Sequence, residues 1–256
     1  MKVAAVQHDI DWEQPELTRK RVAPLIAQAA QAGARLVALT EMYATGFSMR
    51  TERIAEDEGG PNEQFLIDQA REHGCWVLAS IAQFGQDGRA RNNAVLAAPD
   101  GTVQRYAKIH PFSYAREHEY YAAGERFLTV DIAGVRTSLF VCYDLRFADE
   151  FWALADSTDL YVVVANWPEP RREHWRTLLR ARAIENQAYV LGVNRVGSVQ
   201  GAKREQHYVG DSALIDPLGG TVVEAALQET VLVAEVDPDV VARVRRDLPF
   251  LPDRRT

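Results

Sequence analysis

Cysteine is scarce in this chain. Only Cys75 and Cys142 occur among the 256 residues, too few for the disulfide framework that stabilises small secreted domains. Two cysteines are typical of a protein from a reducing compartment, and we expect a cytoplasmic location. The N-terminal segment 1–8 becomes polar too early to be typical of a signal peptide.

The chain also lacks a long apolar run and a surplus of positive charge. No apolar segment approaches the roughly 18 residues that span a bilayer, so we expect no membrane partner. Lys and Arg number 29 against 36 Asp and Glu, which gives a net charge of -7. Nucleic-acid binding requires clustered basic residues, and we therefore expect no nucleic-acid partner. Small molecules are the expected ligands.

Metal-ligand spacing is missing as well. The six histidines show no paired motif of the kind that holds zinc or a catalytic metal. We therefore expect a protein that works without a metal and without a cofactor.

What the chain does contain is the composition of an ordinary globular protein, 47% hydrophobic and 25% charged. Helices are expected at Pro15–Ala32, Pro61–His73, Phe147–Ala155 and Arg171–Gln187. Strands are expected at Lys2–Gln7, Arg35–Thr40, Cys75–Ala82, Asn93–Ala98, Thr102–Ala107, Leu128–Ile132, Val135–Val141, Leu160–Ala165, Tyr189–Val193, Ser212–Ile215, Thr221–Glu224 and Val231–Val236. This alternation predicts an α/β layered fold with mixed sheets, in a single domain over residues 1–256. The polar segment Met49–Gly60 is expected to be a surface loop near a site.

One of the two cysteines lies where a nucleophile is expected. Cys142 ends the strand-like run Val135–Val141 and precedes a predicted helix, and a helix N-terminus favours the thiolate over the thiol. Taken alone, a cysteine in this position is more often a buried core residue. Cys75 opens a strand with no turn or charged partner around it, and we expect it to be structural.

Two further reactive groups also follow predicted strands. Glu41 comes after Arg35–Thr40, and Lys108 comes after Thr102–Ala107. Singly, such charges usually mark the chain reaching water. Together with Cys142 they supply a nucleophile, a proton acceptor and a cation for an oxyanion, which are the groups that acyl transfer needs. The apolar segment Met42–Phe47 is expected to wall the pocket, with Tyr43 and Phe47 as binding residues.

At these positions the chain resembles a known family. The segments Thr40–Met42, Tyr106–His110 and Val141–Phe147 are similar to the three signature segments of the nitrilase, or carbon–nitrogen hydrolase, superfamily. The resemblance continues through Asn166–Pro168, Arg180–Gln187 and Asn194–Gly197. Together these segments look most like the bacterial omega-amidases.

The resemblance implies a four-layer α-β-β-α sandwich of the nitrilase type that forms a homodimer or larger assembly. It implies a catalytic triad of Glu41, Lys108 and Cys142, with the backbone N–H of Tyr143 at the oxyanion. A second glutamate that orients the lysine and the substrate amide is best matched by Glu117. Asn166 and Trp167 are expected to contact the substrate.

The expected function is the cysteine-dependent hydrolysis of a small ω-amide, of the 2-oxoglutaramate or 2-oxosuccinamate type, through a thioester. An amidase for deaminated glutathione, an N-carbamoyl amino-acid hydrolase and a true nitrilase are alternatives with the same chemistry. An acyltransferase using the same thioester is a further alternative, although its membrane versions carry spanning helices. A catalytically inactive binding protein is a remote one.

Charged residues beside these motifs have expected roles too. Arg171 is expected to bind the free carboxylate of the substrate, with Arg172 as the second choice, because a guanidinium binds a carboxylate through two parallel hydrogen bonds. Both arginines are also placed where solvated charges of a first helical turn occur. Asp144 and Arg146 are expected to form a buried ion pair that shapes the turn after Cys142.

Overall fold

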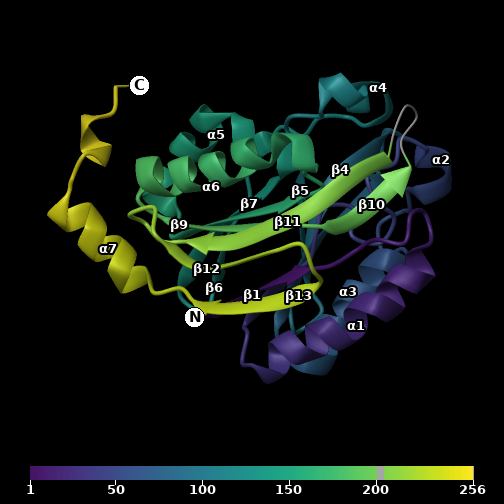
Figure 1. The fold of residues 1–256 in the computed structure, drawn as a ribbon, viewed down its shortest axis with the longest axis horizontal. Coiled ribbons are helices and arrows are strands. Elements are labelled where there is room, and N and C mark those ends of the chain that lie inside the picture. Colours follow the sequence, from purple (N-terminus) through teal and green to yellow (C-terminus); the bar gives the residue numbers. More distant parts are fainter. Residues whose placement is uncertain (201–204, 256) are drawn as a thin grey trace.

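The computed structural model describes residues 1–200 and 205–255, and two sheets form the centre of the molecule (Figure 1). The first sheet has the order β13-β1-β2-β3-β4-β5. Its strands are β1 (Lys2–Gln7), β2 (Leu36–Ala38), β3 (Trp76–Phe84), β4 (Ala90–Ala97), β5 (Val103–Ala107) and β13 (Thr230–Glu235). β1, β2 and β3 run parallel, whereas β4 and β13 pair antiparallel to their neighbours.

The second sheet has the order β10-β11-β9-β8-β7-β6, with β12 also paired to β11. Its strands are β6 (Thr129–Ile132), β7 (Val135–Val141), β8 (Leu160–Ala165), β9 (Tyr189–Asn194), β10 (Val196–Gln200), β11 (Glu205–Ile215) and β12 (Thr221–Ala226). The central strands β7, β8 and β9 are parallel and buried along their whole length, apart from one exposed side chain in β7. Parallel strands of this kind require cover on both faces.

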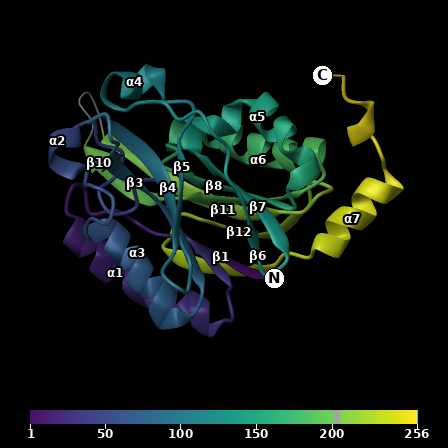
Figure 2. The same ribbon diagram turned by 180° about the vertical axis from the view of Figure 1, so that it is seen from behind.

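Helices cover the outer face of each sheet, and the two sheets cover each other's inner face. α1 (Pro15–Gln31) and α3 (Pro61–His73) pack on the first sheet, and α5 (Ala148–Ala153) and α6 (Arg172–Asn186) lie over the second (Figures 1 and 2). Proline opens α1 and α3, where its missing N–H is not needed. Gly74 ends α3 in the left-handed conformation that favours glycine. The layers are therefore α-β-β-α, as the resemblance implies.

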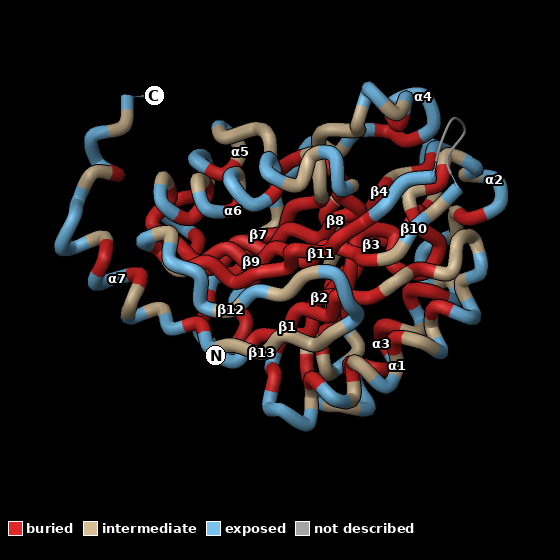
Figure 3. Tube along the Cα trace, in the orientation of Figure 1, coloured by how far each residue is buried: buried red, intermediate tan, exposed pale blue. Residues whose placement is uncertain are grey.

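The main core lies between the two sheets, where inward residues of both meet. It includes Leu36 and Leu78 from the first sheet and Leu139 and Val162 from the second, and the same cluster continues on the outer face of the second sheet to α5 and α6. A second cluster fills the space between the first sheet and helices α1 and α3. Figure 3 shows both sheets as the buried centre, with exposed residues on the outer sides of the helices.

The strand directions bring several strand ends to one edge. β5 is antiparallel to β4, and β4 is antiparallel to β3, so β5 runs in the same direction as β2 and β3. The carboxyl ends of these strands, and those of β7 and β8 in the facing sheet, converge. An edge of this type is where α/β proteins place ligand sites.

Some elements differ from the sequence-based expectation. The segment expected as a surface loop, Met49–Gly60, contains the short helix α2 (Thr51–Ile54). Three elements had no counterpart in the sequence-based expectation: the hairpin partner β10, the short helix α4 (Glu117–Tyr120) and the C-terminal helix α7 (Pro238–Asp247). Among the described residues, no helix is long and apolar enough to cross a membrane.

Candidate active site

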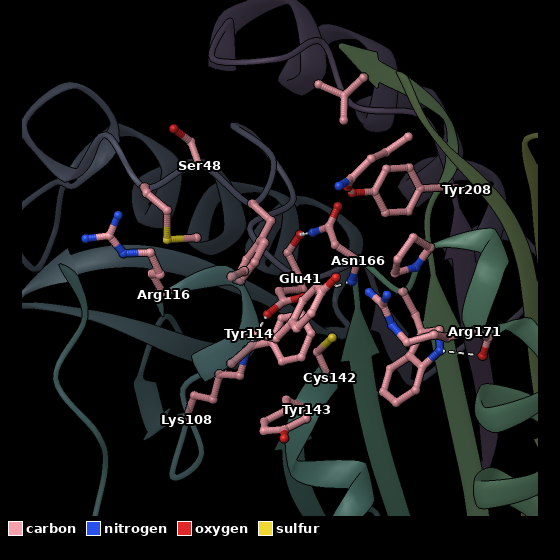
Figure 4. A pocket seen from close by; sticks show the side chains of 18 of the residues that line it. Glu41, Ser48, Lys108, Tyr114, Arg116, Cys142, Tyr143, Asn166, Arg171 and Tyr208 are labelled. Carbon is pink, nitrogen blue, oxygen red and sulfur yellow. Dashed lines mark hydrogen bonds and ion pairs between the residues drawn. The ribbon is translucent and has the colours of Figure 1, made fainter. Parts of the chain in front are cut away.

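A cavity of about 1000 Å³ opens at the shared edge of strand ends. Cys142 directly follows β7, Lys108 directly follows β5, and Glu41 lies three residues beyond β2. All three line the cavity, together with Asn166 after β8. In Figure 4 their side chains gather around one point, with Tyr208 and Arg171 to one side of Cys142 and Ser48 and Arg116 to the other.

Cys142 is held in an unusual backbone conformation. Its φ of 47° is left-handed, which costs a residue other than glycine roughly 1–2 kcal/mol. Cys142 opens a short 3-10 turn, Cys142–Arg146, directly after β7. Tyr143 follows in the first turn, where backbone N–H groups have no partner within the turn itself. The half-buried thiol is thereby presented to the cavity beside free donors.

Lys108 lies between two buried carboxylates. Its Nζ is 3.0 Å from Glu41 Oε1 and 2.9 Å from Glu117 Oε2. The side chains are at most 1% exposed. Burial disfavours the charge on Lys108, but the carboxylates of Glu117 and Glu41 outweigh it and hold the pKa of the ammonium well above its usual value. Lys108 is therefore a permanent cation in the site.

Glu41 is fixed through both carboxylate oxygens. Oε1 accepts from Lys108 and from Asn92 Nδ2, the latter at 2.8 Å. Oε2 accepts from the backbone N–H of Asn166 at 2.8 Å. The side chain of Asn166 in turn donates to the backbone oxygen of Glu41. The carboxylate thus has one orientation, beside the thiol.

The thiol of Cys142 holds its proton at rest. Burial and the negative charge of Glu41 raise its pKa well above the usual range, and Lys108 only partly opposes them. The sequence-based expectation that a helix N-terminus favours the thiolate is therefore corrected. The turn after Cys142 is too short for its dipole to outweigh burial and a neighbouring carboxylate.

Asp144 shapes the turn after Cys142, but not through the expected ion pair with Arg146. Its buried carboxylate accepts from the backbone N–H groups of His110 and Val141 and from the Tyr106 hydroxyl, at 2.8–3.0 Å. Burial raises the pKa of Asp144 to about 6. Arg146 instead lies over the rings of Trp167 and Tyr143, 4.8 and 5.9 Å from their centroids. Backbone donors satisfy the carboxylate, so the arginine side chain stays in the cavity wall.

The loop after β2 contributes only one of its two expected binding residues. Phe47 lines the cavity and lies 5.2 Å from Lys108 Nζ. Tyr43 does not line it: the ring stacks on Phe65 and the hydroxyl donates to the Asn62 backbone oxygen. The left-handed φ of Met42 turns the chain at this point and directs Tyr43 to α3.

The two candidate arginines lie in different surroundings. Arg171 lines the cavity with its guanidinium 5.4 Å from the Phe112 ring, and no carboxylate pairs with it among the residues that the structure describes. Arg172 turns away and binds Asp211 through two hydrogen bonds, of 2.6 and 2.8 Å. Arg171 is thus the one in position to meet a ligand.

Other cavity residues were missed from the sequence. Trp12, Tyr114 and Tyr208 lie far apart along the chain and meet only in the fold. Asn92 contacts both buried carboxylates. The signal for Asn92 was a polar pair, Asn92-Asn93, directly before the apolar run 94–98. No cluster of three or more His, Cys, Asp or Glu side chains arranged to hold a metal ion occurs within residues 1–200 and 205–255.

Comparisons with known proteins agree with this geometry. The model of the family described as "Carbon-nitrogen hydrolase" matches residues 2–246. A 2-oxoglutaramate amidase of Bacillus subtilis is 30% identical over 258 residues, 99% of this chain and 97% of that protein. Omega-amidase YafV of Escherichia coli K12 is 38% identical over 225 residues, 86% of this chain and 84% of that protein.

A similar solved structure gives the same result. The crystal structure of XC1258 from Xanthomonas campestris, a CN-hydrolase superfamily protein with an arsenic adduct in its active site, has a TM-score of 0.92 and 36% identity. The match covers 100% of this chain and 97% of that one.

Proposed function

The chain belongs to the carbon-nitrogen hydrolase family and is a hydrolase of amide carbon–nitrogen bonds, and we propose that its substrate is a short 2-oxo acid with a terminal amide. The observation that carries the proposal is a thiol beside a buried Glu41–Lys108–Glu117 cluster. The same cavity contains the guanidinium of Arg171, with which no carboxylate of the described residues pairs. The names of the relatives in Bacillus subtilis and Escherichia coli support this substrate class.

The proposed reaction has two halves. Glu41 accepts the thiol proton as the sulfur of Cys142 attacks the amide carbon, and Lys108 and the N–H of Tyr143 stabilise the oxyanion. The carbon–nitrogen bond then breaks, Glu41 protonates the leaving ammonia, and a thioester remains. Glu41 next takes a proton from water as the water oxygen attacks the thioester carbon. The carbon–sulfur bond then breaks, the acid leaves, and Glu41 returns the proton to the sulfur of Cys142. The raised pKa of the thiol supports this order, because the proton must be removed as the bond forms.

The cavity walls support an anionic substrate. Arg171 and Arg146 both face the cavity, and the lining carboxylate, Glu41, is already bound to Lys108. A 2-oxo acid would bring a carboxylate to Arg171, with Asn166, Trp167 and Phe47 around the rest of the molecule. An α-ammonium group, as in glutamine, would meet these arginines without a negative partner. We therefore expect 2-oxoglutaramate to be preferred over glutamine.

One alternative substrate has a specific argument. A volume of about 1000 Å³ is larger than a five-carbon monoamide needs. Deaminated glutathione presents the same 2-oxoglutaryl carbonyl on a larger molecule, as an N-substituted amide whose leaving amine is cysteinylglycine in place of ammonia. It is therefore the second candidate.

Ammonia release separates these substrates. We expect the purified protein to act on 2-oxoglutaramate with a kcat/KM at least about 10-fold above that for glutamine, an N-carbamoyl amino acid or a nitrile, because one unfavourable charge contact costs 1–3 kcal/mol. Deaminated glutathione completes the panel, with the release of cysteinylglycine measured in place of ammonia. Cys142→Ala should abolish turnover with an unchanged Tm, whereas the buried Cys75→Ala should retain it. Equal rates on glutamine and 2-oxoglutaramate would contradict the proposed substrate class. Turnover by Cys142→Ala would contradict the proposed mechanism.

We further propose that residues 1–256 form one domain, that the protein works in the cytoplasm, and that it forms a homodimer or larger assembly. The core shared by both sheets supports the first point. A catalytic thiol and the free Cys75 need a reducing compartment, which supports the second. Exposed apolar residues on the helical layer over the second sheet support the third.

A further inference from the structure

The buried cluster beside the thiol contains two carboxylates and one ammonium. Glu41 and Glu117 are fully buried, and both carboxylates contact the same ammonium, that of Lys108. Two like charges that share one counter-ion repel each other, and burial strengthens that repulsion. The backbone N–H groups of Asn166 and Phe112 each bind only one of the two carboxylates, so a second donor that bridges both is needed to hold the pair together.

Asn92 meets this need. Its Nδ2 donates to Glu41 Oε1 at 2.8 Å and to Glu117 Oε1 at 3.2 Å. An amide NH₂ group has two hydrogens, so one neutral side chain serves both carboxylates. Lys108 is the other side chain that contacts both carboxylates through hydrogen bonds within the described residues.

The position of Asn92 in the sheet fixes this arrangement. Asn92 lies near the start of β4, at the edge where β5 ends, and its backbone oxygen accepts from the N–H of Lys108 at 2.9 Å. Side chains alternate between the two faces of a strand. Asn92 therefore faces the second sheet and the site, whereas Asn93 faces α3 and donates to Gln83.

The side-chain oxygen of Asn92 indicates that the NH₂ group, and not the oxygen, is the functional part of this amide. Its Oδ1 is buried and has no hydrogen-bond partner within the described part of the chain. Turning the amide over would place this oxygen against two carboxylates, so the observed orientation is the only favourable one. An unpartnered buried oxygen lowers stability. Asn92 is thus better suited to the carboxylates than to the packing of the strand.

We propose that Asn92 is a positioning residue for amide hydrolysis, whose NH₂ group bridges Glu41 and Glu117 and keeps Glu41 aimed at the thiol of Cys142. The inference rests on the roles proposed above for these two glutamates. Without the bridge, Lys108 alone divides its hydrogens between the two carboxylates, and Glu41 loses the second bond on Oε1. Asn92 itself does not contact the reacting atoms.

The test compares Asn92→Leu with Asn93→Leu. Both changes replace a buried asparagine of β4 by a side chain of similar size and remove amide hydrogen bonds, but only the first affects the site. We would measure kcat and KM with 2-oxoglutaramate from about pH 5 to 9, and Tm for both variants. Donors to a carboxylate favour its charged form. Asn92→Leu should therefore lower kcat about 10-fold or more and move the acid limb of kcat/KM to higher pH by about half a unit or more, with KM changed less than about 3-fold.

Asn93→Leu should lower Tm and leave both the acid limb and kcat unchanged. If Asn92→Leu does not fold, Asn92→Ser gives the same reading, because a serine hydroxyl can donate to one carboxylate at most. An acid limb and a kcat equal to wild type in the folded Asn92 variant would overturn the inference. Failure of the wild-type protein to release ammonia from any ω-amide would instead overturn the proposed function, so the two failures are distinguishable.

Discussion

At the scale of single residues, the charge of Glu41 has two separable effects. As a carboxylate near the thiol it raises the pKa of Cys142, and as a base it would accept the thiol proton during attack. Both effects depend on the orientation that Lys108, Asn92 and the N–H of Asn166 give to its two oxygens. Removing the charge should therefore change thiol reactivity and catalysis in opposite directions.

Glu41→Gln tests that separation. Loss of the negative charge should lower the pKa of the Cys142 thiol, so more thiolate is present at about pH 8 and iodoacetamide should alkylate the variant faster than wild type. Ammonia release should fall about 10²–10⁴-fold, because the general base is gone. Mass spectrometry of the labelled protein gives the first rate, with Cys142→Ala as the control for labelling at Cys75. Slower alkylation of Glu41→Gln would mean that another group keeps the thiol protonated.

Arg171 and Arg172 are neighbours with different expected effects. Arg171→Ala should raise KM for 2-oxoglutaramate about 10–100-fold, since a charge-assisted hydrogen bond contributes about 1.5–3 kcal/mol. Its Tm should not change, because no carboxylate of the described chain pairs with it. Arg172→Ala should instead lower Tm by freeing Asp211, which is mostly buried, and leave KM close to wild type. A wild-type KM for Arg171→Ala would require another group, such as Arg146, to bind the carboxylate.

At the scale of elements, the loop between β2 and α2 forms one wall of the cavity. Gly46 has a φ of 76°, and a side chain there would run into the ring of Trp12. Glu13 holds the next part of the loop by accepting from Ser48 Oγ and Arg50 Nε, at 2.6 and 2.7 Å. Phe47 lies between these two restraints, so its place over Lys108 depends on both.

Gly46→Ala should therefore affect activity as well as stability. The left-handed φ alone costs roughly 1–2 kcal/mol, and displacement of Trp12 and Phe47 should lower kcat/KM about 10–100-fold. Gly88→Ala is the matched control, because Gly88 has a φ of 72° and nothing lies within 4 Å of an added side chain. It should lose stability only, as measured by denaturant unfolding and steady-state kinetics. Equal kcat/KM for the two variants would show that the loop wall tolerates the shift.

Elements with strong local sequence patterns could be predicted from the sequence. Strands and helices with strong patterns, such as β1, α3 and β8, have the predicted bounds. The positions of Glu41, Lys108 and Cys142 after strands predicted that they would meet, because strand direction alone brings such ends together.

Features that depend on partners distant in sequence were not predictable. Asp211 binds Arg172 and holds it away from the cavity, but the two residues are 39 positions apart in the chain. The positive φ of Met42 directs Tyr43 toward α3, and no local sequence pattern predicts this backbone conformation. Helix α7 did carry signals, Asp237 as N-cap and Pro238 in the first turn, but its valines are typical of strands.

At the scale of the whole molecule, the outer surfaces of the two helical layers differ. Trp152 of α5 is 40% exposed and Ile184 of α6 is 46% exposed. Leu218 is 66% exposed, in a turn whose Gly219 lies against Ile184. On the opposite side, Leu17 is the large apolar residue of α1 and α3 that remains exposed. In Figure 1, α7 lies beyond the edge of the sheets, on the side of the molecule where the turn between β11 and β12 is found.

These residues make the α5–α6 layer the expected contact between two copies of the chain. A stable interface buries about 1,200–2,000 Å² and is rich in apolar side chains at its centre. Light scattering at micromolar concentration should therefore show a dimer or larger assembly for the wild type. The double variant Trp152→Lys, Ile184→Lys should dissociate it, because two buried charges without partners oppose association. Leu227→Lys, at a site 73% exposed in a distant turn, should leave the assembly intact. A wild-type monomer would contradict the proposed dimer, whereas an intact assembly in the double lysine variant would move the interface to another face, with α7 as the next surface to change.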